Sequence, residues 1–178
     1  RAKWWNYTWN ASYFITICTQ ELEPYFGEII KNKMVLSEEG IFAEYYWHQI
    51  PNHFPFVEQG AFVVMPNHIH GVIHICRYDF VEPHHDVATG LTNKKAHHNA
   101  PLQRNTGNKF GPQRGNLASI IRAYKGRVTK SSRKIHSGFK WQSRYHDHII
   151  RDEKSLTKIE KYIENNHQVW REDKYFKQ

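Results

Sequence analysis

The stretch that most constrains the fold is residues 61–75, Ala-Phe-Val-Val-Met-Pro-Asn-His-Ile-His-Gly-Val-Ile-His-Ile. Its two β-branched runs favour strands over 61–64 and 68–75, and Pro66-Asn67 favours a turn between them because proline cannot donate to a sheet ladder. Side chains alternate along a strand, so we expect His68 and His70 on one face and Ile69 in the core. Two adjacent neutral imidazoles are half of a divalent-metal site, although structural histidines also produce this pattern.

The remaining elements follow from hydrophobic periodicity and from turn and capping signals. They are a strand near 11–19, a strand or hairpin arm at 29–35, a helix at 37–49 capped by Ser37, a helix from 116, a strand-like segment at 139–150 and a last helix at 156–170. This order predicts an α+β fold. We expect a two-layer sandwich in which helices pack on one face of a central, mostly antiparallel sheet.

The length of 178 residues predicts a single domain spanning 1–178. Residues 77–115 are rich in His, Asn, Gly, Pro and Lys and are nearly without apolar side chains. So long a stretch without predicted structure is unusual inside a domain, so we interpret it as a polar insertion.

The composition favours a nucleic-acid partner. The formal net charge is +8, and basic proteins are attracted to polyanions. The charges of the helix from 116 all have one sign. We expect contacts to DNA phosphates from Arg122, Lys125, Arg127 and Lys130, the alternative being a solvated charged face. No apolar run approaches the ~20 residues of a membrane span. With no signal-peptide pattern and two cysteines expected as free thiols, we expect a cytoplasmic, nucleoid-associated protein.

The last predicted helix carries Tyr162 and Asn166, which are four residues apart and therefore lie one above the other on one face. Periodicity alone makes Tyr162 a residue at the boundary of the apolar stripe and Asn166 the start of a C-terminal cap.

Three motifs occur together along the chain: Met-Pro-Asn-His-Ile-His, Trp-Gln-x-x-Tyr-x-Asp-His-x-Ile-Arg, and a helix with Tyr-Ile-x-x-Asn. In this combination the chain resembles the single-tyrosine transposases of the HUH endonuclease superfamily, in particular the REP-associated tyrosine transposase branch. The resemblance runs from the first strand to the last helix and omits the insertion. It implies a ferredoxin-like HUH nuclease domain.

The resemblance also implies roles for individual residues. Tyr162 would be the nucleophile, and His68, His70 and Asn166 would bind Mg²⁺ or Mn²⁺. Such enzymes cut single-stranded DNA beside hairpin (palindromic) elements and hold the 5′ end as a phosphotyrosine. The family commonly has Asn-Pro where this chain has Asn166-His167, which leaves Asn165 as a rival ligand.

Several alternatives stay open at the level of sequence. Tyr145 and Tyr124 are rival nucleophiles, and the segment His146-Asp147-His148 offers proton acceptors without identifying one. The protein could be a catalytically silent DNA-hairpin-binding descendant of such a transposase, or a metal hydrolase with an incidental tyrosine. It could be a homodimer or a monomer.

Overall fold

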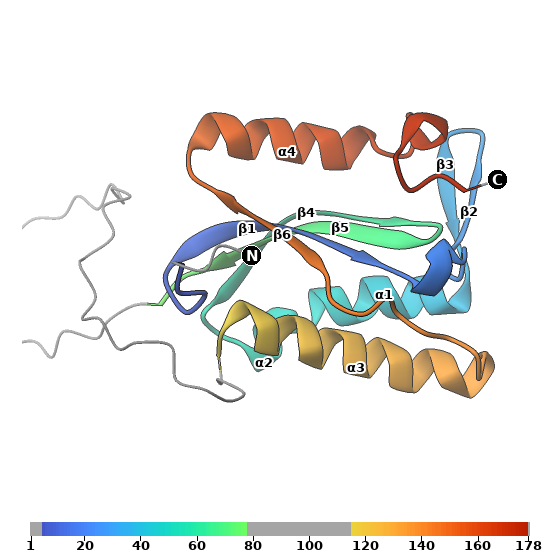
Figure 1. The fold of residues 1–178 in the computed structure, drawn as a ribbon, viewed down its shortest axis with the longest axis horizontal. Helices are drawn as coiled ribbons and strands as arrows, with labels where there is room; N and C mark the ends of the chain where they lie inside the picture. Colours follow the sequence, from blue (N-terminus) through green and yellow to red (C-terminus); the bar gives the residue numbers. More distant parts are fainter. Residues whose placement is uncertain (1–4, 78–114, 178) are drawn as a thin grey trace, which may run out of the picture.

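The core of the protein is a four-stranded sheet whose strand order is β4-β5-β1-β6 and whose neighbours are all antiparallel. The strands are β1 (Ala11–Cys18), β4 (Val57–Met65), β5 (His68–Ile75) and β6 (His146–Ile150). The structure is a computed structural model that describes residues 5–77 and 115–177 (Figure 1). In these ranges no helix is long and apolar enough to cross a membrane.

Helices cover both faces of this sheet. Helices α1 (Glu38–His48) and α3 (Leu117–Ile135) lie on one side with the short α2 (Ile50–His53), and α4 (Glu153–Asn165) lies on the other (Figure 1). The predicted α+β class and antiparallel sheet are confirmed. The expectation that helices share one face was wrong, because the sheet carries apolar side chains on both faces and each face needs cover.

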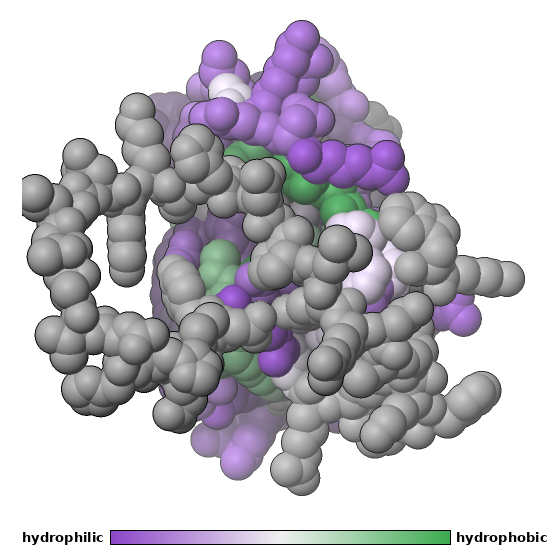
Figure 2. All heavy atoms as spheres, turned by 90° about the vertical axis from the view of Figure 1, so that its left-hand side faces the viewer, coloured by the Kyte–Doolittle hydropathy of each residue, from purple (hydrophilic) through white to green (hydrophobic). Residues whose placement is uncertain are grey.

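Two apolar clusters show this division. The larger contains Ile69 of β5 with Leu117, Ile120 and Tyr124 of α3. The smaller contains Val72 of β5 with Ile163 of α4. In Figure 2, hydrophilic side chains cover the outer surface of the upper layer and hydrophobic ones lie beneath them. Alternate residues of a strand share a side, so His68 and Val72 lie on the same face of β5. Because Val72 packs with Ile163, this face is the α4 face.

Side-chain caps mark the starts of α1, α3 and α4, and the cap predicted at Ser37 is among them. The Ser37 hydroxyl accepts from Gly40 N at 3.1 Å, and the Asp152 carboxylate accepts from Ser155 N at 2.7 Å. The Asn116 side chain caps α3 through Ser119 N at 2.9 Å. Each side-chain oxygen satisfies a backbone N–H that has no partner inside its own helix.

Other boundaries differ from the predictions. Residues 27–36 form a hairpin of β2 (Gly27–Ile30) and β3 (Lys33–Leu36), and the strand predicted over 139–150 is regular only in β6. Strand β4 begins at Val57, before a register shift between Gln59 and Phe62. The 3₁₀ turns are η1 (Gln20–Leu22) and η2 (Trp170–Glu172).

The end of α4 is the correction that matters most for the site. The predicted helix runs to Trp170, whereas α4 ends at Asn165 and the chain then turns into η2. The turn folds residues 170–177 back toward the sheet, and the Trp170 ring lies 5.9 Å from the His68 ring. A continuous helix would have carried these residues away from β5.

Candidate metal and tyrosine site

His68 and His70 stand at the start of β5 on its α4 face and are almost completely buried, at 0% and 1% exposure. Strand β1 runs beside them, with Cys18 opposite His68 and Thr16 opposite His70. Ile69 points the other way into the larger apolar cluster, as the alternation predicts.

The tautomer of His68 is set by Asn67. The Asn67 amide nitrogen donates to the carbonyls of Leu22 at 3.1 Å and Tyr175 at 2.8 Å, which directs its oxygen toward His68. That oxygen lies 2.8 Å from His68 Nδ1, so Nδ1 carries the proton and donates. The lone pair of His68 is therefore on Nε2, which points into the site, and such an orienting partner is typical of metal-binding histidines.

His70 faces the same point. Its Nε2 lies 3.1 Å from His68 Nε2, and its Nδ1 lies 2.8 Å from the Thr16 hydroxyl. The hydroxyl can donate or accept, so it serves either tautomer of His70. At this spacing both nitrogens would be able to bind one shared cation.

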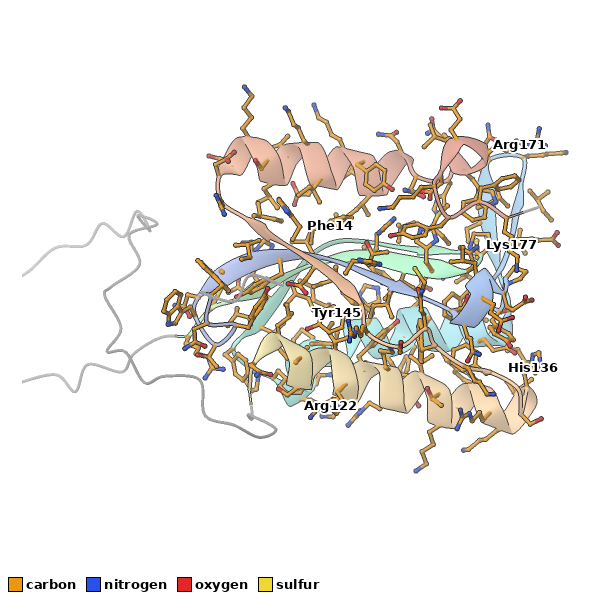
Figure 3. The ribbon with its side chains drawn as sticks, in the orientation of Figure 1. Phe14, Arg122, His136, Tyr145, Arg171 and Lys177 are labelled. Atoms are coloured by element: carbon orange, nitrogen blue, oxygen red, sulfur yellow. The ribbon has the colours of Figure 1, made fainter. Side chains whose placement is uncertain are left out.

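Helix α4 brings Tyr162 and Asn166 to the histidines. The Tyr162 hydroxyl lies 3.2 Å from His70 Nε2, although the two residues are 92 positions apart in the chain. Tyr162 is 39% exposed, whereas Asn166 is fully buried. The Phe14 ring packs on His70 and edge-on against Tyr162, and Figure 3 shows it between the sheet and α4.

Asp173, just beyond η2, is a site residue that sequence reasoning missed. Its Oδ2 accepts from the Tyr162 hydroxyl at 3.2 Å and from Asn166 Nδ2 at 3.4 Å, and its Oδ1 accepts from Tyr175 N at 2.7 Å. The ligand atoms of Asp173, His68 and His70 all lie within 4.8 Å of one another. Asp173 follows the end of α4 in an irregular segment, so no periodic signal connects it to the histidines.

The donor set fits a divalent cation. Asn166 Oδ1 is buried and has no hydrogen-bond partner among the described residues, and a buried carbonyl oxygen without a partner is costly. A metal ion beside His68 and His70 would satisfy it. Nitrogen and oxygen donors of this kind suit a divalent metal ion.

Burial sets the electrostatics of the cluster. Burial holds the pKa of His68 well below 6.5, helped by His70 and Lys174. Burial also lowers the pKa of His70, although Asp173 partly opposes the shift. Both rings are thus neutral, which is the state that binds metal. Burial, together with the negative charge of Asp173, raises the pKa of Tyr162 to about 12.

The rival residues take other positions. Tyr124 is buried in the larger apolar cluster on the opposite side of the sheet, and its hydroxyl donates to Ala43 O at 3.0 Å. Tyr145 packs against the same apolar cluster. Asn165 is exposed, and its amide donates to Lys161 O at 2.7 Å. Thr16 of β1 pairs with His70 of β5 on one side and with His146 of β6 on the other. His146 is therefore two strands away from His70.

The four predicted DNA-binding residues do not join this cluster. Arg122, Lys125, Arg127 and Lys130 lie on α3, which covers the other face of the sheet. Figure 3 shows Arg122 on that side, away from Phe14. Arg122 and Lys125 line a groove beside α3, and Arg127 and Lys130 are exposed outside it.

Among relatives in sequence, an uncharacterized protein of Haemophilus influenzae is 38% identical over 180 residues, which cover 99% of this chain and 91% of that protein. No protein-family model matches the chain.

One solved structure supports the fold. A REP-associated tyrosine transposase bound to a REP hairpin aligns with a TM-score of 0.56 at 16% identity, over all of this chain and 77% of that one. A crystal structure described as that of a candidate transposase from Deinococcus radiodurans aligns with a TM-score of 0.46 at 15% identity, over 94% of this chain and 97% of that one, a score too low to establish a shared fold. The chain has a transposase-like fold, and by sequence it belongs to the same protein family as the Haemophilus influenzae protein.

Proposed function

We propose that the protein is a metal-dependent single-stranded DNA endonuclease and strand transferase, a transposase that acts at hairpin-associated sites through a 5′-phosphotyrosine. The observation that carries the proposal is the 3.2 Å distance between the Tyr162 hydroxyl and His70 Nε2. A tyrosine oxygen beside a buried histidine pair is what attack on a metal-oriented phosphate requires.

In this proposal His68, His70 and Asn166 hold Mg²⁺ or Mn²⁺, with Asp173 as a neighbouring carboxylate. When bound, the cation supplies Lewis-acid polarisation of the phosphate and helps to orient it. All three ligands are neutral and so do not reduce the double charge of the ion, and the nearby negative charge is that of Asp173. Asn67 and Thr16 hold the two imidazole rings in place.

In the transfer step one P–O bond forms and another P–O bond breaks. The Tyr162 oxygen attacks the phosphorus, a new P–O bond to tyrosine forms, and the P–O bond to the 3′ oxygen breaks. The phenol proton passes to Asp173, whose Oδ2 already accepts it in a hydrogen bond at 3.2 Å. The 3′ oxygen leaves and takes up a proton. Because the phosphotyrosine retains the phosphodiester energy, a 3′-hydroxyl can reverse the step and rejoin strands without ATP.

The proposed partner is single-stranded DNA next to a hairpin, bound partly by the cations of α3. The REP-associated tyrosine transposase with the same fold is bound to a hairpin. A substrate of this kind would place the protein in the cytoplasm with the nucleoid.

A denaturing gel tests the proposal directly. A 5′-labelled and a 3′-labelled hairpin DNA with single-stranded flanks are incubated with the protein and Mn²⁺. We expect a covalent adduct that carries the 3′ label, because the protein joins the 5′ end of the downstream fragment. The adduct should be abolished in Tyr162→Phe and by EDTA, and kept in Tyr45→Phe, which removes an exposed phenol from α1.

An adduct that persists in Tyr162→Phe contradicts the assignment of the nucleophile. Hairpin binding by the wild-type protein with no adduct on any substrate would support the catalytically silent hairpin-binding protein instead. Multiple-turnover cleavage without an adduct would support a hydrolase.

A further inference from the structure

An open groove of about 600 Å³ lies between α3 and the segment 140–145, on the opposite face of the sheet from Tyr162. Five cations line it, and none of the described residues that line it is acidic. The cations are Arg122, Lys125 and Arg133 of α3 and Lys140 and Arg144 of the segment. Only two of them, Arg122 and Lys125, belong to the set predicted from the sequence.

The wall of the groove is held in place by two of these cations. Lys125 Nζ donates to the carbonyls of Gln142 at 2.8 Å and Arg144 at 3.0 Å, and Arg133 Nε donates to Phe139 O at 3.1 Å. In return, Trp141 Nε1 donates to Lys125 O at 3.2 Å. The groove is therefore formed before any ligand binds.

The other three cations remain available. Arg122, Lys140 and Arg144 are exposed, and within residues 5–77 and 115–177 none of them forms an ion pair or a side-chain hydrogen bond. The α3 wall from Arg122 to Arg133 extends about 16 Å at 1.5 Å per residue. A row of cations of this length suits consecutive phosphates of a polymer better than a single anion.

The residues that follow β1 connect the groove to the tyrosine site. Thr19 N donates to Asn67 O at 2.9 Å, and Asn67 orients His68. The next residue, Gln20, donates from its N to Lys140 O at 3.0 Å and also lines the groove. Two consecutive residues thus join the histidine turn to the groove wall, just beyond the end of strand β1.

We propose that this groove binds the phosphodiester backbone of the DNA substrate, next to the part of the strand that reaches Tyr162. The inference rests on the proposed function for the identity of the substrate, and it adds Arg133, Lys140 and Arg144 to the DNA-binding surface. Arg122, Lys140 and Arg144 contact phosphates, whereas Lys125 and Arg133 mainly hold the wall.

The test compares two triple variants with equal loss of charge. The groove variant is Arg122→Gln/Lys140→Gln/Arg144→Gln. The control is Lys31→Gln/Lys33→Gln/Lys154→Gln, which removes three exposed cations that lie outside both the groove and α3. Binding of a fluorescent hairpin with single-stranded flanks is measured by anisotropy in EDTA at several salt concentrations.

The groove variant should bind at least tenfold more weakly at low salt. Its log–log salt slope should be shallower by about 2, since each contact to a single strand contributes about 0.7. The control should stay within threefold of wild type. Equal losses in both variants, or wild-type affinity in the groove variant, would overturn the inference.

The chemistry is measured separately with Mn²⁺ and saturating DNA, where the groove variant should still form the tyrosine adduct. A groove-specific loss of binding without any wild-type adduct would refute the proposed chemistry and leave the groove standing. A wild-type adduct combined with unchanged binding by the groove variant would refute the groove alone.

Discussion

At the scale of single residues, His68 and His70 combine two properties that rarely coexist. They are polar and titratable, yet they are almost fully buried on the face of the sheet that α4 covers. A histidine in this environment stays neutral because burial penalises the charged ring. The sequence predicted the shared face of the two rings, whereas the Asn67 contact that sets the tautomer of His68 is seen only in the structure.

The histidine pair should make the metal-free protein sensitive to acid. Burial lowers both pKa values below 6.5, the value expected in the unfolded chain. Below pH 6.5 the unfolded chain therefore binds protons that the folded protein does not. The free energy of unfolding should fall with decreasing pH, by up to about 1.36 kcal/mol per pH unit for each histidine, and this contribution should vanish above pH 6.5.

Urea unfolding in EDTA between pH 7 and pH 5 measures this dependence. The His68→Gln variant has one fewer titrating ring, so its free energy of unfolding should fall less steeply over the same range. Parallel pH profiles for the two proteins would contradict the expected neutral state of His68.

At the scale of elements, β5 packs against the helices on both faces of the sheet. Its His68 face meets α4, and on its other face the Trp47 ring of α1 stacks on Phe62 with ring centroids 4.6 Å apart. Gly71 makes room for this ring, since a Cβ at that position would lie 2.2 Å from Trp47 Cζ2. Glycine is therefore required at this point of a strand because of packing, not because of its backbone angles.

Two glycine-to-alanine changes should act in opposite directions. Gly71→Ala should lower the free energy of unfolding by about 1–3 kcal/mol, because the rigid Trp47 ring has to move within a packed core. Gly126→Ala should raise it by about 0.8–1 kcal/mol, because a Cβ there meets nothing within 4 Å and alanine favours the helix. Chemical denaturation of both variants measures the two effects. A neutral Gly71→Ala would show that α1 can shift freely.

At the scale of the whole molecule, the candidate metal site joins the sheet to α4 and the C-terminal segment. His68 and His70 come from β5, Asn166 from the end of α4, and Asp173 from beyond η2. An ion held by His68, His70 and Asn166, with Asp173 beside it, binds the folded protein and has no comparable site in the unfolded chain. Binding of the ion should therefore raise the free energy of unfolding of the whole protein.

Mn²⁺ should raise the free energy of unfolding by about 2.7 kcal/mol at 100 times its Kd. Asn166→Ala should weaken Mn²⁺ binding at least tenfold and reduce this gain, whereas Asn165→Ala, whose amide bonds to Lys161 O, should keep it. Thermal unfolding with and without Mn²⁺ gives both values. A larger loss in Asn165→Ala would identify the other asparagine as the ligand.

Properties that depend on neighbours along the chain could be determined from the sequence. Strand alternation placed His68 and His70 on one face, helical spacing placed Tyr162 above Asn166, and side-chain chemistry predicted the cap at Ser37. These rules work because a strand repeats every two residues and a helix every 3.6. They say nothing about which apolar stripe covers which face of a sheet.

Only the tertiary structure decided how these pieces combine. Packing of Ile163 against Val72 puts α4 on the histidine face and so brings Tyr162 to His70, while α3 takes the other face with its cations. The early end of α4 then returns Asp173 to the cluster. These contacts join residues that are far apart in the chain. They depend on the shapes and apolar areas of whole layers, which the periodicity of a single strand or helix does not specify.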